Sequence, residues 1–213
     1  MQIKFNGYTK IMGSDKVIDN VNLTMESGNV YGFKGQNGSG KTMLMRAICG
    51  LILPTDGNVT IDDKIVGKDI SFPESVGLLL ENPSFINGYS GFKNLKMIVS
   101  IRKKINDSQI ADAMQKVGLD PKDKRHYRKY SLGMKQKLGI ACAIMEEPDL
   151  IILDEPFNGL DEAGILRVKD IVHEAKESGA LVILTCHDNE ELYEMSDEIY
   201  LLEGGRIRGH EIP

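Results

Sequence analysis

The chain has 213 residues, enough to bury a sizeable core, and we expect one compact unit with an inserted subdomain. Its formal net charge of −5 argues against nucleic acid as the main partner, because nucleic-acid-binding domains are usually basic. Three widely separated cysteines predict reduced thiols in a cytosolic protein. The N-terminus lacks a signal-peptide pattern, and no segment approaches the roughly 20 apolar residues of a membrane span.

The first part of the chain predicts strands and one short helix. Apolar and polar side chains alternate over the first thirty residues, which favours an antiparallel layer. Val30–Phe33 predicts a buried strand, and Met43–Cys49 predicts a helix. Further strands are expected at Val59–Ile61 and Val76–Leu80, with turn residues before and after the first of them.

From about residue 82 to residue 130 the apolar period is helical, so we predict an inserted helical subdomain. Asp107 is expected to cap one of its helices at the N-terminus, and Gly118 is expected to end that helix. The basic run Lys122–Lys129 predicts a solvated loop at the end of the insertion.

Helices and buried strands alternate in the last third of the chain. Continuous apolar runs are typical of parallel strands that are covered on both faces. This alternation predicts an α/β core with a parallel sheet, whose ligand lies at the carboxyl ends of the strands. In chain order we expect a helix at 132–145, a strand at 150–153, a helix ended by Gly179, a strand from 181, a short helix at 189–195, and a strand at 199–202 followed by a hairpin turn at Gly204-Gly205.

Gly35-Gln36-Asn37-Gly38-Ser39-Gly40-Lys41-Thr42 fits the P-loop pattern of Gly, four residues and Gly-Lys-Thr, between a predicted strand and a predicted helix. The glycines allow backbone N–H groups to turn around an anion. Lys41 is expected at the β- and γ-phosphates and the Thr42 hydroxyl at Mg²⁺. A Gly-rich surface turn is the alternative. The predicted nucleotide ligands here are Gly35, Asn37, Gly38, Ser39, Gly40, Lys41, Thr42 and Met43.

Asp154-Glu155 follows the buried strand at 150–153 and predicts the second half of this site. Asp154 is expected to hold Mg²⁺, and Glu155 is expected to accept a proton from water as general base. The alternative is that Asp-Glu-Pro only ends a strand. Two further strand ends carry polar residues, Glu81 and His187. His187 is a candidate donor to a γ-phosphate oxygen, with a purely structural histidine as the alternative.

The order of these motifs resembles the nucleotide-binding subunit of an ATP-binding-cassette (ABC) transporter over nearly the whole chain. Tyr130-Ser131-Leu132-Gly133-Met134-Lys135-Gln136 is similar to the ABC signature segment. Asn158–Asp161 is similar to the D-loop and His187 to the switch histidine, and Glu81-Asn82-Pro83 stands at the Q-loop position. The resemblance implies a P-loop NTPase core at 1–81 and 131–213, with its N-terminal antiparallel β layer, and a helical subdomain at about 82–130.

The resemblance also implies ATP and Mg²⁺ as cofactors. Two ATP molecules are expected in a two-fold dimer, each between the P-loop of one protomer and Ser131, Gly133 and Met134 of the other, with Asp161 nearby. Glu81 and His187 are expected to assist Glu155 in catalysis, and Glu81 is also expected near the metal with Thr42 and Asp154. Met12 stands where relatives carry an adenine-stacking ring, and Tyr8 is the alternative stacking residue.

The Ser-Leu-Gly-Met signature and Glu81 are similar to a subgroup of exporters linked to bacitracin, lantibiotics and other antimicrobial peptides. The implied function is ATP hydrolysis that drives export through a separate membrane permease, on the inner face of the cell membrane. Alternatives are a soluble assembly or repair ATPase, and a nucleotide sensor, which the intact site disfavours. The cargo and the choice between homodimer and heterodimer stay open. Five residues are candidates either for an apolar permease-docking surface or for ordinary core: Phe85, Ile86, Tyr89, Phe92 and Leu95.

Overall fold

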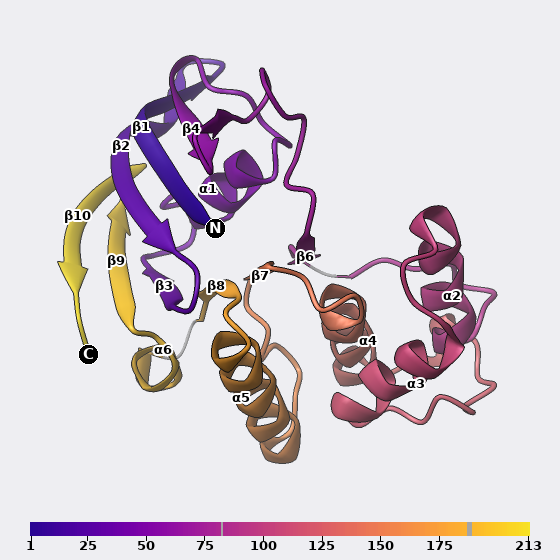
Figure 1. The fold of residues 1–213 in the computed structure, drawn as a ribbon. Coiled ribbons are helices and arrows are strands. Elements are labelled where there is room, and N and C mark those ends of the chain that lie inside the picture. The colour runs from indigo at the N-terminus through magenta and orange to yellow at the C-terminus, as the bar shows by residue number, and fades with distance from the viewer. Residues whose placement is uncertain (82, 187–188) are drawn as a thin grey trace.

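A computed structural model describes residues 1–81, 83–186 and 189–213. Two sheets and their helices make an α/β fold with a helical lobe to one side (Figure 1). The strands are β1 (Gln2–Met12), β2 (Asp15–Glu26), β3 (Val30–Lys34), β4 (Asp56–Ile61), β5 (Lys64–Ile65), β6 (Val76–Leu79), β7 (Leu150–Leu153), β8 (Leu181–Thr185), β9 (Glu198–Glu203) and β10 (Arg206–Glu211). The helices are α1 (Lys41–Ile48), α2 (Gly91–Arg102), α3 (Asp107–Lys116), α4 (Leu132–Ile144), α5 (Glu162–Glu177), α6 (Asn189–Met195) and a 3₁₀ turn η1 (Tyr127–Lys129).

The N-terminal strands form the predicted antiparallel layer, with the order β2-β1-β4-β5. The second sheet has the order β10-β9-β3-β8-β7-β6, and its strands from β9 to β6 run parallel. Only β10 is antiparallel to its neighbour β9, after the hairpin turn at Gly204-Gly205. The carboxyl ends of β3, β7 and β8 therefore meet at one edge of this sheet, as expected for a nucleotide site.

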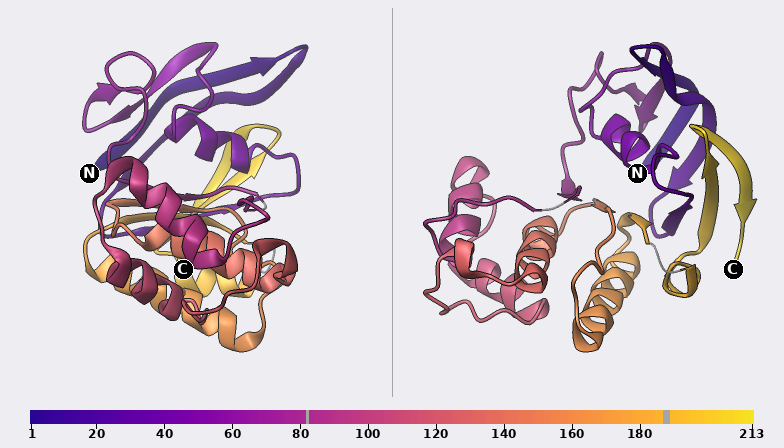
Figure 2. Two further views of the ribbon diagram at one scale, coloured as in Figure 1. Left: turned by 90° about the vertical axis from the view of Figure 1, so that its right-hand side faces the viewer. Right: turned by 180° about the vertical axis from the view of Figure 1, so that it is seen from behind.

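Side chains of β7 alternate between two separate hydrophobic clusters. Leu150 and Ile152 pack with α1 and the antiparallel layer, whereas Ile151 and Leu153 pack with α4 and α5. The same alternation holds along β8, and every residue of both strands is buried. Figure 2 shows the result, a central sheet with helices on one face and α1 and the antiparallel layer on the other. Apolar residues on both faces explain the continuous apolar runs.

Helices α2 and α3 lie away from the two sheets (Figure 1); α3 packs on α4, and α2 packs on α3. The predicted cap of α3 is wrong by one residue. Asn106 is the N-cap and forms a capping box with Gln109, so Asp107 becomes the first helical residue. At the other end Val117 is the C-cap, and Gly118 follows it with φ 78°.

The basic run at 122–129 is only partly the solvated loop that its charge predicts. Its end forms η1, and Tyr127 within it is buried, with 3% of its surface exposed. The Tyr127 hydroxyl donates a hydrogen bond of 2.6 Å to the Pro83 carbonyl oxygen. Tyr127 is thus a core residue within the basic run, and its hydrogen bond connects the beginning and the end of the helical segment. Within the described ranges, no helix is long and apolar enough to cross a membrane.

Candidate nucleotide site

The P-loop connects β3 to α1 at the carboxyl edge of the parallel sheet. Gly40 is the N-cap of α1 with φ 109°, a conformation that a residue with a side chain rarely adopts. A Cβ on Gly35 would lie 2.3 Å from the Leu202 carbonyl oxygen, so the loop backbone is packed directly against β9. These two positions need glycine, and they present the first N–H groups of α1 to an anion.

Two buried polar side chains of this loop fit a phosphate group. Lys41 has 8% of its surface exposed, and its Nζ donates to the carbonyl oxygens of Gly35 and Gln36 at 2.7 and 3.1 Å. The buried Ser39 hydroxyl has no hydrogen-bond partner among the described residues. Leaving such a group unpaired costs about 1–3 kcal/mol. A phosphate oxygen would satisfy Ser39, so the residues present fit a nucleotide.

Asp154 is the centre of a hydroxyl–carboxylate chain. Thr42 Oγ1 on α1 donates to Asp154 Oδ2 at 2.6 Å, and Thr185 Oγ1 at the end of β8 donates to Asp154 Oδ1 at 2.6 Å. Asp154 is 6% exposed. Both donors fix the carboxylate beside the P-loop, where Asp154 and Thr42 supply the oxygen ligands that Mg²⁺ prefers.

Glu155 comes directly after Asp154 and has a left-handed backbone, with φ 52°. For a residue with a side chain this conformation costs roughly 1–2 kcal/mol. Its backbone N–H donates to Thr185 Oγ1 at 2.9 Å, and its carboxylate Oε2 accepts from Asn158 Nδ2 at 2.8 Å. Gln136 Nε2 on α4 donates to the carbonyl oxygens of Glu155 and Pro156, at 3.0 and 3.2 Å. The surrounding bonds hold a strained residue in one conformation, as is common at functional sites.

Glu81, expected near the metal, forms an ion pair of 2.6 Å with Arg46 on α1. Within the described part of the chain, its carboxylate bonds to Arg46 and not to Thr42 or Asp154. The structure thus brings Glu81 to the P-loop helix rather than to the Asp154 chain. His187 lies outside the described residues.

The signature-like segment begins α4. Ser131 is the N-cap, and its Oγ accepts from the Met134 N–H at 3.2 Å. A Cβ on Gly133 would lie 2.5 Å from the Gly159 carbonyl oxygen, so this segment and the loop after β7 pack backbone to backbone. Among the described residues, no hydrogen bond connects Ser131, Gly133 or Met134 to the P-loop. The segment is therefore a second, separate helix N-terminus.

Asp161, in the D-loop-like segment, is the N-cap of α5 and accepts from the Gly164 N–H at 3.2 Å. Its Oδ1 also accepts from Lys137 Nζ on α4 at 3.1 Å. The hydrogen bond from Lys137 holds the pKa of the Asp161 carboxyl below its usual value. Asp161 thus links α4 to α5 next to the Gly133–Gly159 contact.

The two adenine-stacking candidates differ in exposure. Met12, at the end of β1, is 50% exposed. Tyr8 has no exposed surface, lies edge-on against Phe5, and donates its hydroxyl to the Ile52 carbonyl oxygen at 3.2 Å. Burial raises the pKa of Tyr8 to about 12. Tyr8 as the stacking residue is therefore wrong, because its ring belongs to the core.

Three functional neighbours were missed at the level of sequence: Thr185, Gln136 and Arg46. Each reaches its partner through a contact between residues 19 to 35 positions apart in the chain, which leaves no local motif. A polar residue at the end of the buried strand β8 was the available signal for Thr185.

Lys34, directly before the P-loop, has its Nζ 4.8 Å from the centre of the Tyr193 ring and points onto α6.

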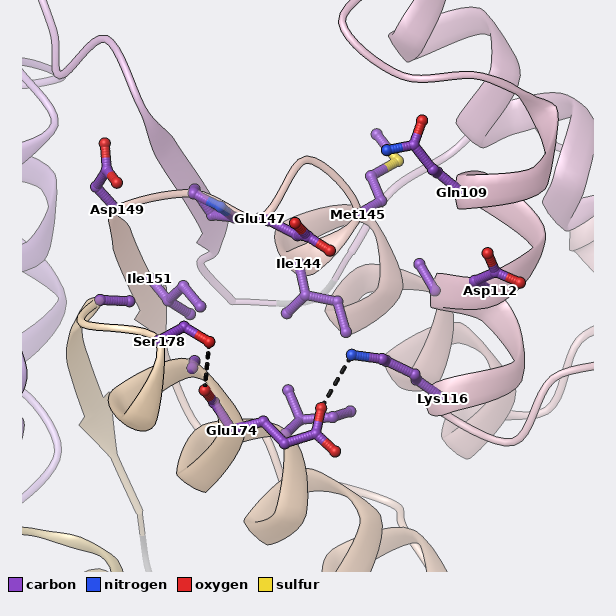
Figure 3. A pocket seen from close by; sticks show the side chains of 15 residues that line it. Gln109, Asp112, Lys116, Ile144, Met145, Glu147, Asp149, Ile151, Glu174 and Ser178 are labelled. Atoms are coloured by element: carbon purple, nitrogen blue, oxygen red, sulfur yellow. Dashed lines mark hydrogen bonds and ion pairs between the residues drawn. The ribbon is translucent and has the colours of Figure 1, made fainter.

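A cavity of about 390 Å³ lies elsewhere, between α3, the end of α4 and α5 (Figure 3). It is lined by Asp149 and Ala180, which precede β7 and β8 and so mark the amino edge of the sheet, opposite the P-loop. Lys116 on α3 and Glu174 on α5 form an ion pair of 2.9 Å across it. The cavity lies between the helical lobe and α5, away from the nucleotide site.

Comparisons with known proteins agree with this geometry. The family model described as ABC transporter matches residues 18–158. The uncharacterized ABC transporter ATP-binding protein YybJ of Bacillus subtilis is 45% identical over 203 residues, covering 95% of this chain and 93% of that protein. The bacitracin transport ATP-binding protein BcrA of Enterococcus faecalis is 35% identical, covering 96% and 67% of the two chains. The lantibiotic transport ATP-binding protein SrtF of Streptococcus pyogenes is 33% identical, covering 96% and 88%.

A solved dimeric ATP-binding cassette, in a post-hydrolysis state with ADP and Pi, has the same fold. Its TM-score is 0.88 with 21% identity, covering 99% of this chain and 98% of that one. The predicted α/β fold class with its antiparallel layer is confirmed. On its sequence match, its relatives and its phosphate-binding geometry, the chain belongs to the ABC transporter family, as an ATP-binding and ATP-hydrolysing member.

Proposed function

We propose that this chain is the ATPase subunit of an exporter, working with a separate membrane permease to move an antimicrobial peptide or a similar small molecule. The observation that carries the proposal is the Thr42–Asp154–Thr185 chain beside the P-loop, with Glu155 attached to it through Thr185. The named functions of BcrA and SrtF, bacitracin and lantibiotic transport, support the class of cargo.

The residues divide the hydrolysis of ATP between them. Lys41, Ser39 and the N–H groups of α1 bind the β- and γ-phosphates. Thr42 and Asp154 would hold Mg²⁺, which would neutralise phosphate charge there. Glu155 accepts a proton from the water whose oxygen bonds to the γ-phosphorus, while the bond between that phosphorus and the β–γ bridging oxygen breaks to leave ADP. His187 donates to the γ-phosphate.

A two-fold dimer completes the site in this proposal. The exposed N-cap residue Ser131 and the N–H group of Gly133 form a helix N-terminus suited to a phosphate, beside Met134, whose own N–H is bonded to Ser131 Oγ. Because no hydrogen bond among the described residues ties this helix N-terminus to the chain's own P-loop, it is available to the nucleotide of a second protomer. Asp161, next to Gly159, lies at the same surface. ATP then stabilises the closed dimer by linkage, and hydrolysis releases it.

The helical lobe offers a place for the permease. The residues proposed earlier as docking surface do not act together, because Leu95 is buried in the core and Phe85 and Phe92 pack against it, whereas Ile86 is 48% exposed. Three other apolar side chains lie exposed on one face of α2, and we call them the α2 patch: Met97, Ile98 and Ile101. Through such contact the chain would sit at the cytoplasmic membrane face.

The dimer is tested first with Glu155→Gln, which keeps bound ATP intact. Light scattering should show a dimer with ATP and Mg²⁺ and a monomer without nucleotide. Ser131→Arg in the same background should bind ATP and stay monomeric, because the arginine occupies the surface that faces the partner's phosphate. A stable dimer of the Ser131→Arg protein would contradict the assignment of the signature segment.

The permease is tested by affinity capture of the Glu155→Gln protein from detergent-solubilised cells with ATP and Mg²⁺. We expect a polytopic membrane protein in stoichiometric yield, lost with Ile101→Asp and kept with the control Ile212→Asp. Ile212 is exposed to a similar extent, 77% against 81%, but lies at the C-terminus. Recovery of soluble partners alone would favour the assembly or repair alternative.

A further inference from the structure

An ion pair joins α1 to the segment that follows β6. Arg46 Nη2 lies 2.6 Å from Glu81 Oε1, and the two side chains keep 35% and 62% of their surface exposed. Pairs this exposed contribute little to folding stability. We therefore consider where the pair lies relative to Thr42 and Asp154.

Arg46 follows Thr42 by four residues in α1, so the two residues lie on one helical face about 6 Å apart along the axis. Thr42 is the residue whose hydroxyl donates to Asp154. Arg46 thus lies one helical turn along α1 from Thr42, whose hydroxyl is one of the oxygens that would hold Mg²⁺.

Glu81 approaches the same place from the sheet. The Asp154 N–H donates to the carbonyl oxygen of Leu79 at 2.8 Å, and Glu81 is two residues further along the chain. Glu81 has φ 56°, a left-handed conformation that is disfavoured for a residue with a side chain. A strained turn beside Asp154 therefore delivers its carboxylate to Arg46.

We propose that Arg46 is a positioning residue, which compensates the charge of Glu81 and competes with Mg²⁺ for its carboxylate. The proposal rests on the phosphate site of the proposed function. While Glu81 Oε1 is bonded to the guanidinium, it is a weaker metal ligand, and its negative charge repels the nucleotide less. Once Glu81 turns to the metal, the guanidinium becomes free to attract phosphate oxygens.

This competition predicts effects of opposite sign for the two partners. Arg46→Gln leaves Glu81 uncompensated, so metal-free ATP should bind about 3- to 10-fold more weakly and the divalent ion more tightly by a similar factor. Glu81→Gln leaves Arg46 uncompensated, so metal-free ATP should bind more tightly and the metal more weakly. The double variant should return metal-free ATP binding close to its starting value. Arg46→Lys, which keeps the charge, should resemble the unchanged protein.

The measurements use the Glu155→Gln protein, so that ATP is not consumed. Calorimetry with ATP in EDTA gives the metal-free affinity, and electron paramagnetic resonance with Mn²⁺ gives the metal affinity of the ATP complex. Both effects should shrink as salt is raised, because the charges are exposed. Lys96→Gln and Asp107→Asn remove another exposed ion pair, on the helical lobe, and should change neither affinity.

The role of Arg46 would be overturned if Arg46→Gln and Glu81→Gln changed both affinities in the same direction and by the same factor. It would also be overturned if neither variant changed the affinities more than the Lys96 and Asp107 controls do. Either result, with normal ATP binding by the Glu155→Gln parent, leaves the proposed function standing. Absence of ATP binding by that parent would instead contradict the proposed function itself. Thermal melting of the nucleotide-free variants verifies that each one folds.

Discussion

The two ends of the parallel sheet are built in different ways. At the carboxyl edge, Thr42, Asp154 and Thr185 form one continuous hydrogen-bonded chain inside the protein. At the amino edge, a cavity lies between the helical lobe and α5, and the exposed pair Lys116–Glu174 crosses it. Buried bonds fix atoms in place, whereas an exposed ion pair costs little to break. The chemistry is thus held by a rigid edge, and the helical lobe is attached by a looser one.

Removing the general base should have the largest effect on the rigid edge. Glu155→Gln should lower the ATP turnover rate about 100- to 10,000-fold, because water then loses its proton acceptor. ATP binding should change little, since Lys41 and the loop are intact. Steady-state phosphate release and calorimetry measure the two quantities. Turnover at the unchanged rate would mean that another residue is the base.

Loss of Lys41 should act on binding instead of on the chemical step. Lys41→Ala removes a charged donor to phosphate, so ATP affinity should fall by about 10- to 100-fold or more, and ATP-dependent dimerisation should fall with it. Calorimetry with ATP and Mg²⁺ measures the affinity. An unchanged dissociation constant would refute the role of Lys41.

Thr185 tests whether the rigid edge depends on its hydroxyl chain. Thr185→Val has the same shape but leaves Asp154 Oδ1 and the Glu155 N–H without this partner, so unfolding free energy should fall by about 1–3 kcal/mol. Thr185→Ser, which keeps the hydroxyl, is the matched control. Urea unfolding compares the variants. Equal stability of the two would show that the hydroxyl contributes no net energy.

On the helical side, single contacts should matter less. Tyr127→Phe loses one hydrogen bond to the Pro83 carbonyl oxygen, which should lower stability by about 0.5–1.5 kcal/mol. Hydrogen exchange should rise in α2 and α3 and stay unchanged in β7 and β8. Equal acceleration in both regions would mean that the lobe and the sheet open as one unit.

The smallest expected effect is a difference in alkylation rate between Cys49, beside the antiparallel layer, and Cys142, beside the helical lobe. Burial raises the pKa of the Cys49 thiol to about 12 and that of Cys142 to about 11. At pH 8 both thiols stay protonated in the folded state, so alkylation should be slow and should require opening. Cys49 follows α1 in the rigid layer, whereas Cys142 lies in α4, on which the lobe packs, so Cys142 should label first. Faster labelling of Cys49 would reverse the comparison.

Most of the fold was predictable because its signals are local. The apolar runs of β7 and β8 and the P-loop with its flanking strand and helix each occupy a short stretch of sequence. The predictions were wrong where two neighbouring residues could both cap a helix, and where the burial of a side chain depends on tertiary packing. Asn106 caps α3 ahead of Asp107 because its side chain and Gln109 form a reciprocal pair. Tyr8 is turned into the core, which alternation along β1 does not reveal for a half-polar side chain.

The site was predictable in its motifs and less so in its supports. Lys41, Thr42, Asp154 and Glu155 stand in recognisable patterns, and their roles stay predictions until they are tested. Gln136 and Thr185 reach their partners only after α4 and β8 are packed, so nothing near them in sequence indicates their bonds. Helix starts such as Ser131 are visible, but their use by a second protomer depends on how two copies meet.

The alternation along β7 and β8 has a consequence for how this protein can diverge. Even-numbered positions of β7 belong to the hydrophobic cluster of α1 and the antiparallel layer, and odd-numbered positions belong to the cluster that contains α4, α5 and the helical lobe. Residues on the two faces of β7 therefore have to fit two different hydrophobic clusters. Substitutions at Ile151 or Leu153 can therefore repack the helical face of the sheet while the side chains behind the phosphate site remain as they are. The two faces of the sheet can change in sequence independently of each other.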